Sequence, residues 1–151
     1  MAIFGTKYYA ELRSKYKGVL WRVEISERGY TGPSEEMIFD GGTPLQITWE
    51  KRGDEFYVPV KASEATINIL CKENFHYLAL FTSDPRYFRV SIFRNRQLYW
   101  RGYVTSDLYS ENFTAPPYTV TIKAVDGFNL LSSIPFRGLV HIGIAGRRSL
   151  W

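Results

Sequence analysis

The feature of this sequence that most limits its fold is an alternation of apolar and polar residues, repeated between short turn-forming stretches. A period of two places the apolar side chains on one face of a β-strand. The apolar members of the alternating sets are Val19, Trp21, Val23 and Ile25; Leu45, Ile47 and Trp49; Ala65, Ile67, Ile69 and Cys71; Phe88, Val90 and Ile92; Leu98, Trp100 and Val104; and Val120, Ile122 and Ala124. A further strand is expected over residues 7–13. The sequence therefore predicts a chain built mostly of half-buried strands.

Only two segments have helical character. Residues 73–81 have apolar side chains at a spacing that fits one or two helical turns, which can cover one end of a sheet. Asp126 is placed to cap a short helix, with Phe128 and Leu131 packing inward. No segment can form a helix that crosses between parallel strands. We therefore expect an all-β fold: a mainly antiparallel β-sandwich or partly open barrel with one or two short helices.

The hairpin around Asn95 and Arg96 allows a sharper prediction. The aliphatic residues on both sides of this turn sit at even positions. A two-residue loop over residues 95–96 pairs even positions with odd ones, which splits the apolar face. The loop must therefore have an odd number of residues, such as 95–97, or the hairpin must carry a β-bulge.

The charge distribution argues against nucleic acid as a partner. The formal net charge is +4, but Arg137, Arg147 and Arg148 lie in a final stretch, residues 136–151, that contains no acidic residue. The preceding residues are almost neutral, whereas a duplex-binding domain usually has a concentrated basic face. No apolar run approaches the roughly 20 residues that a membrane-spanning helix needs. We expect neither a nucleic-acid nor a membrane partner.

The last residues differ from the rest. Residues 1–135 read as one β-rich structural domain, and residues 136–151 form a basic segment interrupted by glycines that ends at Trp151. A terminal tryptophan after so little structure suggests that the natural chain continues. A short natural tail is the alternative.

Motifs for catalysis or metal binding are weak. A single cysteine, Cys71, excludes an internal disulfide and a multi-cysteine zinc site. If Cys71 were a nucleophile, His76 would be the only nearby residue in the sequence that could act as its base. The simpler interpretation is that Cys71 is a small buried thiol of the core. Asp107 and Glu111 could form the carboxylate pair of a glycosidase, but the same holds for any two acidic residues, so this signal is weak. We expect no enzyme, no metal and no cofactor, and a hydrolase fragment is the third hypothesis.

The best candidates for binding are aromatic and basic. The odd positions of the hairpin form a set opposite the aliphatic face: Tyr87, Arg89, Tyr99, Arg101 and Tyr103. Tyrosine and arginine are enriched at protein-interface hot spots, and the same residue types stack on sugars or bases. The alternative is an ordinary solvated sheet face with cross-strand pairs.

The connection before the last strand adds three apolar candidates. Leu108, Tyr109 and Phe113 lie on a predicted loop over residues 106–118. Large apolar side chains on a loop need a partner, which is either the same domain or another subunit. We include these three residues in the candidate interface.

Several of these runs, taken together, resemble a known kind of protein. The runs are Phe88–Asn95, Leu98–Val104, Asp107–Glu111, Pro117–Val120 and Ala124–Phe128, with Trp21 and Gly29–Gly32 before them. They are similar to the opening region of tail or baseplate proteins encoded by phages and prophages of Bacteroidetes. The resemblance covers residues from about 18 to 131. One departure is Arg96, at a turn position where the family often has glycine.

The resemblance implies an assembly role without catalytic residues. It implies a virion tail component, made in the cytoplasm of a bacterial host, whose partners are other phage tail proteins. It also implies a homo-oligomer, a cyclic ring such as a trimer or hexamer. The alternative is a carbohydrate-binding β-sandwich module that uses the Tyr/Arg face and takes a glycan.

Overall fold

The predicted strands are present, and several extend beyond the residues that alternate clearly. The computed structural model of the protein describes residues 3–49, 62–73, 76–105 and 114–128. Its strands are β1 (Phe4–Arg13), β2 (Leu20–Arg28), β3 (Glu35–Glu36), β4 (Leu45–Trp49), β5 (Ser63–Cys71), β6 (Phe88–Arg94), β7 (Gln97–Val104) and β8 (Tyr118–Asp126). The expectation of an all-β chain is confirmed.

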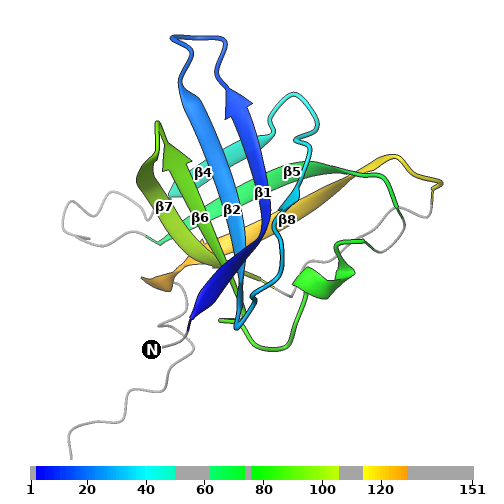
Figure 1. The fold of residues 1–151 in the computed structure, drawn as a ribbon. Coiled ribbons are helices and arrows are strands. Elements are labelled where there is room, and N and C mark those ends of the chain that lie inside the picture. The colour runs from blue at the N-terminus through cyan, green and yellow to red at the C-terminus, as the bar shows by residue number, and fades with distance from the viewer. Residues whose placement is uncertain (1–2, 50–61, 74–75, 106–113, 129–151) are drawn as a thin grey trace, which may run out of the picture.

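These strands form a single mixed sheet (Figure 1). The order across the sheet is β3-β1-β2-β6-β7-β8-β5-β4. Every pair of neighbours is antiparallel except β1 and β3, which run parallel over two residue pairs. The sheet is therefore mainly antiparallel, as the absence of long helices in the sequence predicts.

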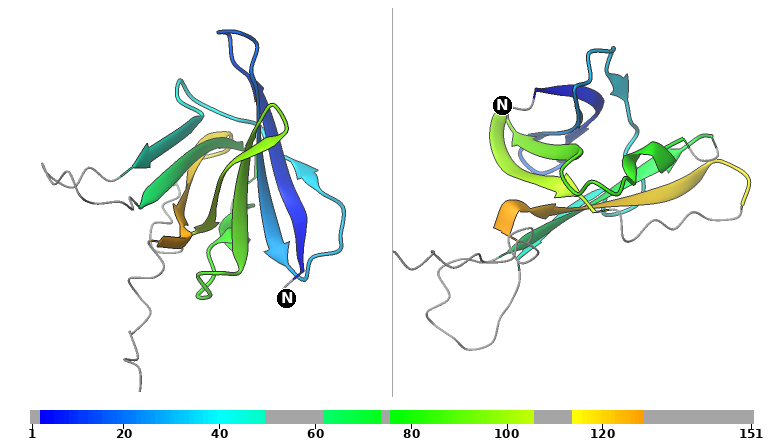
Figure 2. Two further views of the ribbon diagram at one scale, coloured as in Figure 1. Left: turned by 90° about the vertical axis from the view of Figure 1, so that its left-hand side faces the viewer. Right: turned by 90° about the horizontal axis from the view of Figure 1, so that it is seen from below.

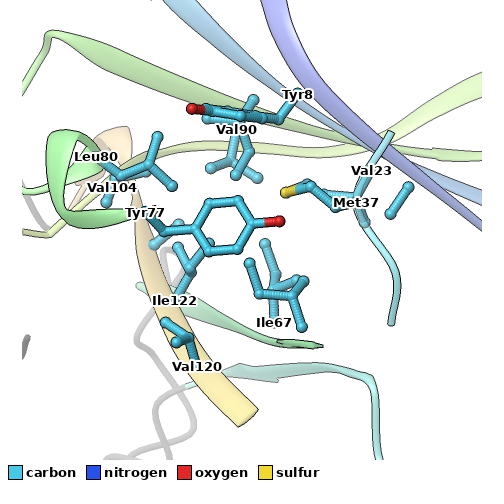
Figure 3. Close-up of a cluster of buried hydrophobic side chains, with 14 of the residues drawn as sticks. Tyr8, Val23, Met37, Ile67, Tyr77, Leu80, Val90, Val104, Val120 and Ile122 are labelled. Carbon is cyan, nitrogen blue, oxygen red and sulfur yellow. The ribbon is translucent and has the colours of Figure 1, made fainter. Parts of the chain in front are cut away.

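The sheet curls so that its two halves face each other across one apolar core (Figure 2). One half is built from β1, β2, β6 and β7, and the other from β5 and β8. Figure 3 shows Val90 of β6 and Ile122 of β8 on opposite sides of Tyr77. The alternation predicts most of this core, since Val23, Ile25 and Ile67 are fully buried. One continuous curved sheet corresponds to the partly open barrel more closely than to a sandwich of two sheets.

A short connection joins β1 and β5, which lie near opposite ends of the strand order. The N–H of Met37 donates to the carbonyl oxygen of Tyr9 in β1, at 2.7 Å. At the next residue the chain has already reached β5, where the N–H of Leu70 donates to the carbonyl oxygen of Ile38 at 2.8 Å. The N–H of Asp40 donates to β5 as well. Residues 35–40, which we call the seam, therefore bridge β1 and β5.

The helical prediction over residues 73–81 is confirmed in a reduced form. A single 3-10 turn, Leu78–Leu80, is present there. Tyr77 and Leu80 insert into the core while Leu78 faces solvent. The turn covers the end of the barrel away from the β1–β2 hairpin (Figure 1).

The β6–β7 hairpin follows the bulge alternative. Arg94 pairs with Gln97, so the loop has two residues, and the register shifts between Ile92 and Phe93. The extra residue in β7 lies between Leu98 and Trp100. This bulge keeps Trp100 opposite Ile92 on the core face, but it places Leu98 opposite Phe93 on the outer face. The assignment of Leu98 to the core is therefore wrong, and its side chain is 47% exposed.

Asp126 has the predicted capping contact. Its Oδ1 accepts a hydrogen bond from the N–H of Phe128 at 3.1 Å, and residues 127–128 are helical. The prediction that Phe128 packs inward is wrong, because its side chain is 55% exposed. Leu131 and the C-terminal segment 136–151 lie outside the described residues. Within the described ranges, no helix is long and apolar enough to cross a membrane.

Candidate protein-interaction site

Three of the predicted interface residues share the outer face of β6 and β7. Arg89 pairs with Tyr103 across the two strands, and Arg101 pairs with Ser91. The guanidinium of Arg89 lies 4.4 Å from the ring centroid of Phe4, in a cation–π arrangement. The structure therefore brings Arg89, Arg101 and Tyr103 together, as the alternation predicts.

Tyr99 does not join this group. It is the bulge residue of β7, and the bulge turns its side chain to the inner side of the sheet. There its ring meets Trp21 edge-on, with centroids 5.3 Å apart. The prediction that Tyr99 shares a face with Arg89 and Arg101 is wrong, because a bulge interrupts the period of two.

Tyr87 is also separate, because its hydroxyl belongs to an ion-pair network. The hydroxyl donates to Oε1 of Glu27 at 3.0 Å, and this hydrogen bond raises the pKa of Tyr87. The other carboxylate oxygen of Glu27 binds Nζ of Lys7 at 2.7 Å. Tyr87 therefore links the segment just before β6 to β2. The remaining candidates, Leu108, Tyr109 and Phe113, lie outside the described residues.

The inner aromatic residues line a groove at the open end of the barrel, beside the tip of the β1–β2 hairpin. The groove has a volume of about 350 Å³. We call it the aromatic groove, and it is lined by Leu12, Ser14, Trp21, Leu45, Ile47, Trp49 and Tyr99. Trp49 is 50% exposed and Tyr99 is 47% exposed. The groove thus presents large apolar surface to solvent, which commonly marks a contact site.

Two hairpins hold one wall of the groove in place. Asn95 in the β6–β7 turn accepts a hydrogen bond on Oδ1 from the N–H of Leu20, at 3.0 Å. Its own N–H donates to the carbonyl oxygen of Leu20 at 2.8 Å. Trp21 and Tyr99, on the two hairpins, are therefore fixed relative to each other. The guanidinium of Arg94 lies 5.7 Å from the Trp21 ring centroid, beside the groove.

The other wall of the groove is a strand edge. The N–H of Asn68 donates to the carbonyl oxygen of Pro44, so in this register Gln46 and Thr48 direct their backbone groups at β5. Leu45, Ile47 and Trp49 alternate with them, and their backbone groups point away from β5. In the described part of the chain, no strand pairs with this edge of β4. Such an edge is a template for another strand.

The other chemical candidates have ordinary structural contacts. The thiol of Cys71 is buried and lies 2.9 Å from the carbonyl oxygen of Glu73. His76 Nε2 lies 3.0 Å from Oε1 of Glu35, beside a cavity of about 160 Å³. Among the described residues, no three His, Cys, Asp or Glu side chains group in a way that could hold a metal ion.

Sequence reasoning missed the aromatic groove, although two signals for it are present. Trp21 and Trp49 both lie near the ends of predicted strands, on the apolar side of the alternation. An aromatic residue at the end of a strand lies near the mouth of a barrel, where ligand sites are common. That Tyr99 lies beside them depends on the bulge.

No family model, no curated protein and no solved structure matches this chain.

Proposed function

We propose that this protein is a structural component of a phage tail tip or baseplate that assembles through protein–protein contacts. The observation that supports assembly most directly is the aromatic groove beside the unpaired edge of β4. The resemblance of residues from about 18 to 131 to Bacteroidetes phage tail proteins supports the setting. The partners are then other tail proteins and further copies of this chain, in a cyclic ring such as a trimer or hexamer, on the virion tail.

The groove has the features of a contact point for a polypeptide. A strand added to β4 would gain backbone hydrogen bonds from Leu45, Ile47 and Trp49. A large apolar side chain from that strand would fill the groove and cover Trp49. Tryptophan and tyrosine are common hot-spot residues because they bury a large area with few rotatable bonds. One contact thus supplies both hydrogen bonds and apolar burial.

A glycan-binding module is the second candidate, and the half-exposed Trp49 and Tyr99 favour it. Aromatic rings at the mouth of a barrel can stack on sugars. The three tyrosines of the predicted Tyr/Arg face do not lie together, because only Tyr103 remains beside Arg89 and Arg101. The groove has Ser14 as its only polar lining residue among the described residues. A sugar would find few partners for its hydroxyl groups there.

The test is the solution mass of the full chain by size exclusion with light scattering. A ring of copies gives a multiple of the 17.5 kDa protomer mass. Trp49→Ala should then weaken association by about thirtyfold, the effect of losing a hot spot of about 2 kcal/mol. Leu78→Ala is the matched control, because Leu78 is a comparably exposed apolar residue at the other end of the barrel.

A monomeric wild-type chain would contradict self-assembly through the groove. Equal weakening by Trp49→Ala and Leu78→Ala would show that the groove is not the contact. A glycan-array signal that Trp49→Ala abolishes in a monomeric protein would favour the sugar-binding candidate instead.

A further inference from the structure

Most half-buried cations of the sheet have a carboxylate partner. The ion pairs are Lys7–Glu27 at 2.7 Å, Arg22–Glu24 at 2.7 Å, Arg22–Glu11 at 2.9 Å, Arg28–Asp84 at 2.9 Å and Lys123–Glu64 at 3.4 Å. Neutralisation of this kind is the normal arrangement, because a cation that loses water needs hydrogen-bond acceptors in exchange.

Arg89 and Arg101 depart from this arrangement. They lie on neighbouring strands of the outer face, in two residue pairs that are separated by the Val90–Gly102 pair. In the described part of the chain, no carboxylate lies within ion-pair distance of either guanidinium. The Nε atom of Arg89 is buried and has no hydrogen-bond partner. We call these two residues the arginine pair.

The surroundings make this arrangement unfavourable in the isolated chain. Burial lowers the pKa of Arg89, and the nearby charge of Arg101 lowers it further. Both effects disfavour the charged form, and arginine keeps its charge in proteins. The face of Phe4 compensates in part through its cation–π contact with Arg89. Glu24 acts on Arg89 only at longer range, because its carboxylate contacts Arg22. Two neighbouring like charges with no carboxylate in contact, among the described residues, indicate that an anion can bind there.

We propose that the arginine pair receives a carboxylate from an acidic segment of a neighbouring protein chain. This inference rests on the proposed assembly function for the nature of the partner, but it uses a different surface from the aromatic groove. Arg101 is exposed and gives access, while Arg89 lies deeper beside Phe4 and Tyr103. The planar guanidinium fork matches the two oxygens of a carboxylate.

The charge pattern favours a protein carboxylate over a nucleic-acid phosphate. A phosphate polymer is held by many cations along a stripe, because each contact neutralises one phosphate. The cations next to the pair are already neutralised, as Arg22 is by Glu11 and Glu24. The guanidiniums of the arginine pair lie beside the aromatic rings of Phe4 and Tyr103. They therefore suit a single acidic residue that is followed or preceded by an apolar residue.

The experiment measures binding of short fluorescein-labelled probes to the full chain by fluorescence anisotropy. The probes are hexaglutamate, hexaglutamine and a six-nucleotide single-stranded DNA. We expect saturable binding of hexaglutamate, and none of hexaglutamine or DNA at the same concentrations. Arg101→Gln should weaken hexaglutamate binding about tenfold or more. Lys15→Gln, which removes one exposed positive charge from the β1–β2 hairpin, should change it less than about twofold.

A thermal melt of the same variants separates binding from folding. Arg101→Gln removes a like charge beside Arg89, so its unfolding temperature should equal or exceed that of the wild type. Loss of binding without loss of stability is the expected signature.

Three results would overturn the proposal: no hexaglutamate binding, equal losses in Arg101→Gln and Lys15→Gln, or tighter binding of DNA than of hexaglutamate. Failure of the groove experiment leaves this test unaffected, because Trp49→Ala does not alter the arginine pair. The two proposals can therefore fail separately.

Discussion

The indole nitrogen of Trp100 donates a hydrogen bond to the hydroxyl oxygen of Ser63, 2.9 Å away in the core. The same hydroxyl donates to Oδ2 of Asp126 at 2.6 Å, and the N–H of Ser63 donates to that oxygen at 2.8 Å. The three residues come from β7, β5 and β8. Pairing between β7 and β8 is short, over Gly102–Val104. The buried network thus reinforces the junction of β7 and β8, where the antiparallel ladder has only three residue pairs.

Removing the carboxylate should destabilise the protein. In Asp126→Ala the buried N–H and hydroxyl of Ser63 lose their acceptor, which costs about 1–3 kcal/mol. Urea unfolding measures the change. Glu64→Ala is the control, because the partly exposed Glu64–Lys123 pair is worth only about 0–1 kcal/mol. Equal losses in the two variants would show that the network carries no special stability.

The turn at Arg96 is strained, and glycine should relieve the strain. Arg96 has a φ of 67°, a left-handed conformation that costs a residue with a side chain about 1–2 kcal/mol. Glycine also makes the unfolded chain more flexible, so the net gain for Arg96→Gly should be about 0.5–1 kcal/mol. Gln97→Gly, the next residue and part of β7, should instead destabilise by about 0.5–1 kcal/mol. Thermal unfolding of both variants checks the opposite signs.

Gly102 should not tolerate a side chain. A Cβ at this position would lie 2.3 Å from a ring carbon of Trp100 and 2.3 Å from the carbonyl oxygen of Val125. Gly102→Ala should therefore cost about 1–3 kcal/mol through overpacking. Gly42→Ala is the matched control, since nothing lies within 4 Å of its Cβ. If chemical denaturation finds the two variants equally stable, the close packing at Gly102 is not important.

The protein should lose stability in alkaline solution, partly through Tyr77. Burial raises the pKa of Tyr77 well above its ordinary value of 10.0. A raised folded-state pKa contributes stability that is present below the unfolded pKa and is lost as the pH rises above it. Tyr77→Phe should therefore reduce the fall in the urea midpoint above about pH 10. Tyr16→Phe, at a tyrosine that is 76% exposed, should leave that fall unchanged.

The alternation in the sequence was sufficient to predict most of the strands and most of their inner faces. Ile67, Ile69 and Ile122 are buried because hydrophobic burial and strand geometry favour the same face. The need for a bulge or an odd loop in the β6–β7 hairpin also followed from the pattern. That prediction required only that both strands keep their aliphatic residues on one side.

The position of the bulge did not follow from the pattern. The same residues allow a bulge on either strand, and each choice sends different side chains inward. Placing it at Tyr99 moves Leu98 to the outer face and Tyr99 to the aromatic groove. The candidate site was therefore predicted only in part, with Arg89 and Arg101 correctly grouped and Tyr99 misplaced.

The seam was not predictable either. The two residues of β3, Glu35 and Glu36, are both exposed and have no apolar alternation. Backbone hydrogen bonds hold this segment in place. Because almost every residue has the same backbone N–H and C=O groups, such bonds cannot be predicted from the pattern of side chains. Met37, buried just after β3, and Phe39, packed against the core, are the local signs that the segment packs inward.

The seam has a consequence for how the barrel opens. Few backbone hydrogen bonds join β1 to β5 through residues 35–40, whereas long ladders join β5 to β8 and β1 to β2. Cooperative units with fewer contacts open at lower free energy. Amide hydrogen exchange should therefore be faster at Met37 and Asp40 than at Ile67, under conditions where the rest of the sheet stays intact. We therefore expect the contact between β1 and β5 along the seam to open by local unfolding, before the rest of the sheet unfolds.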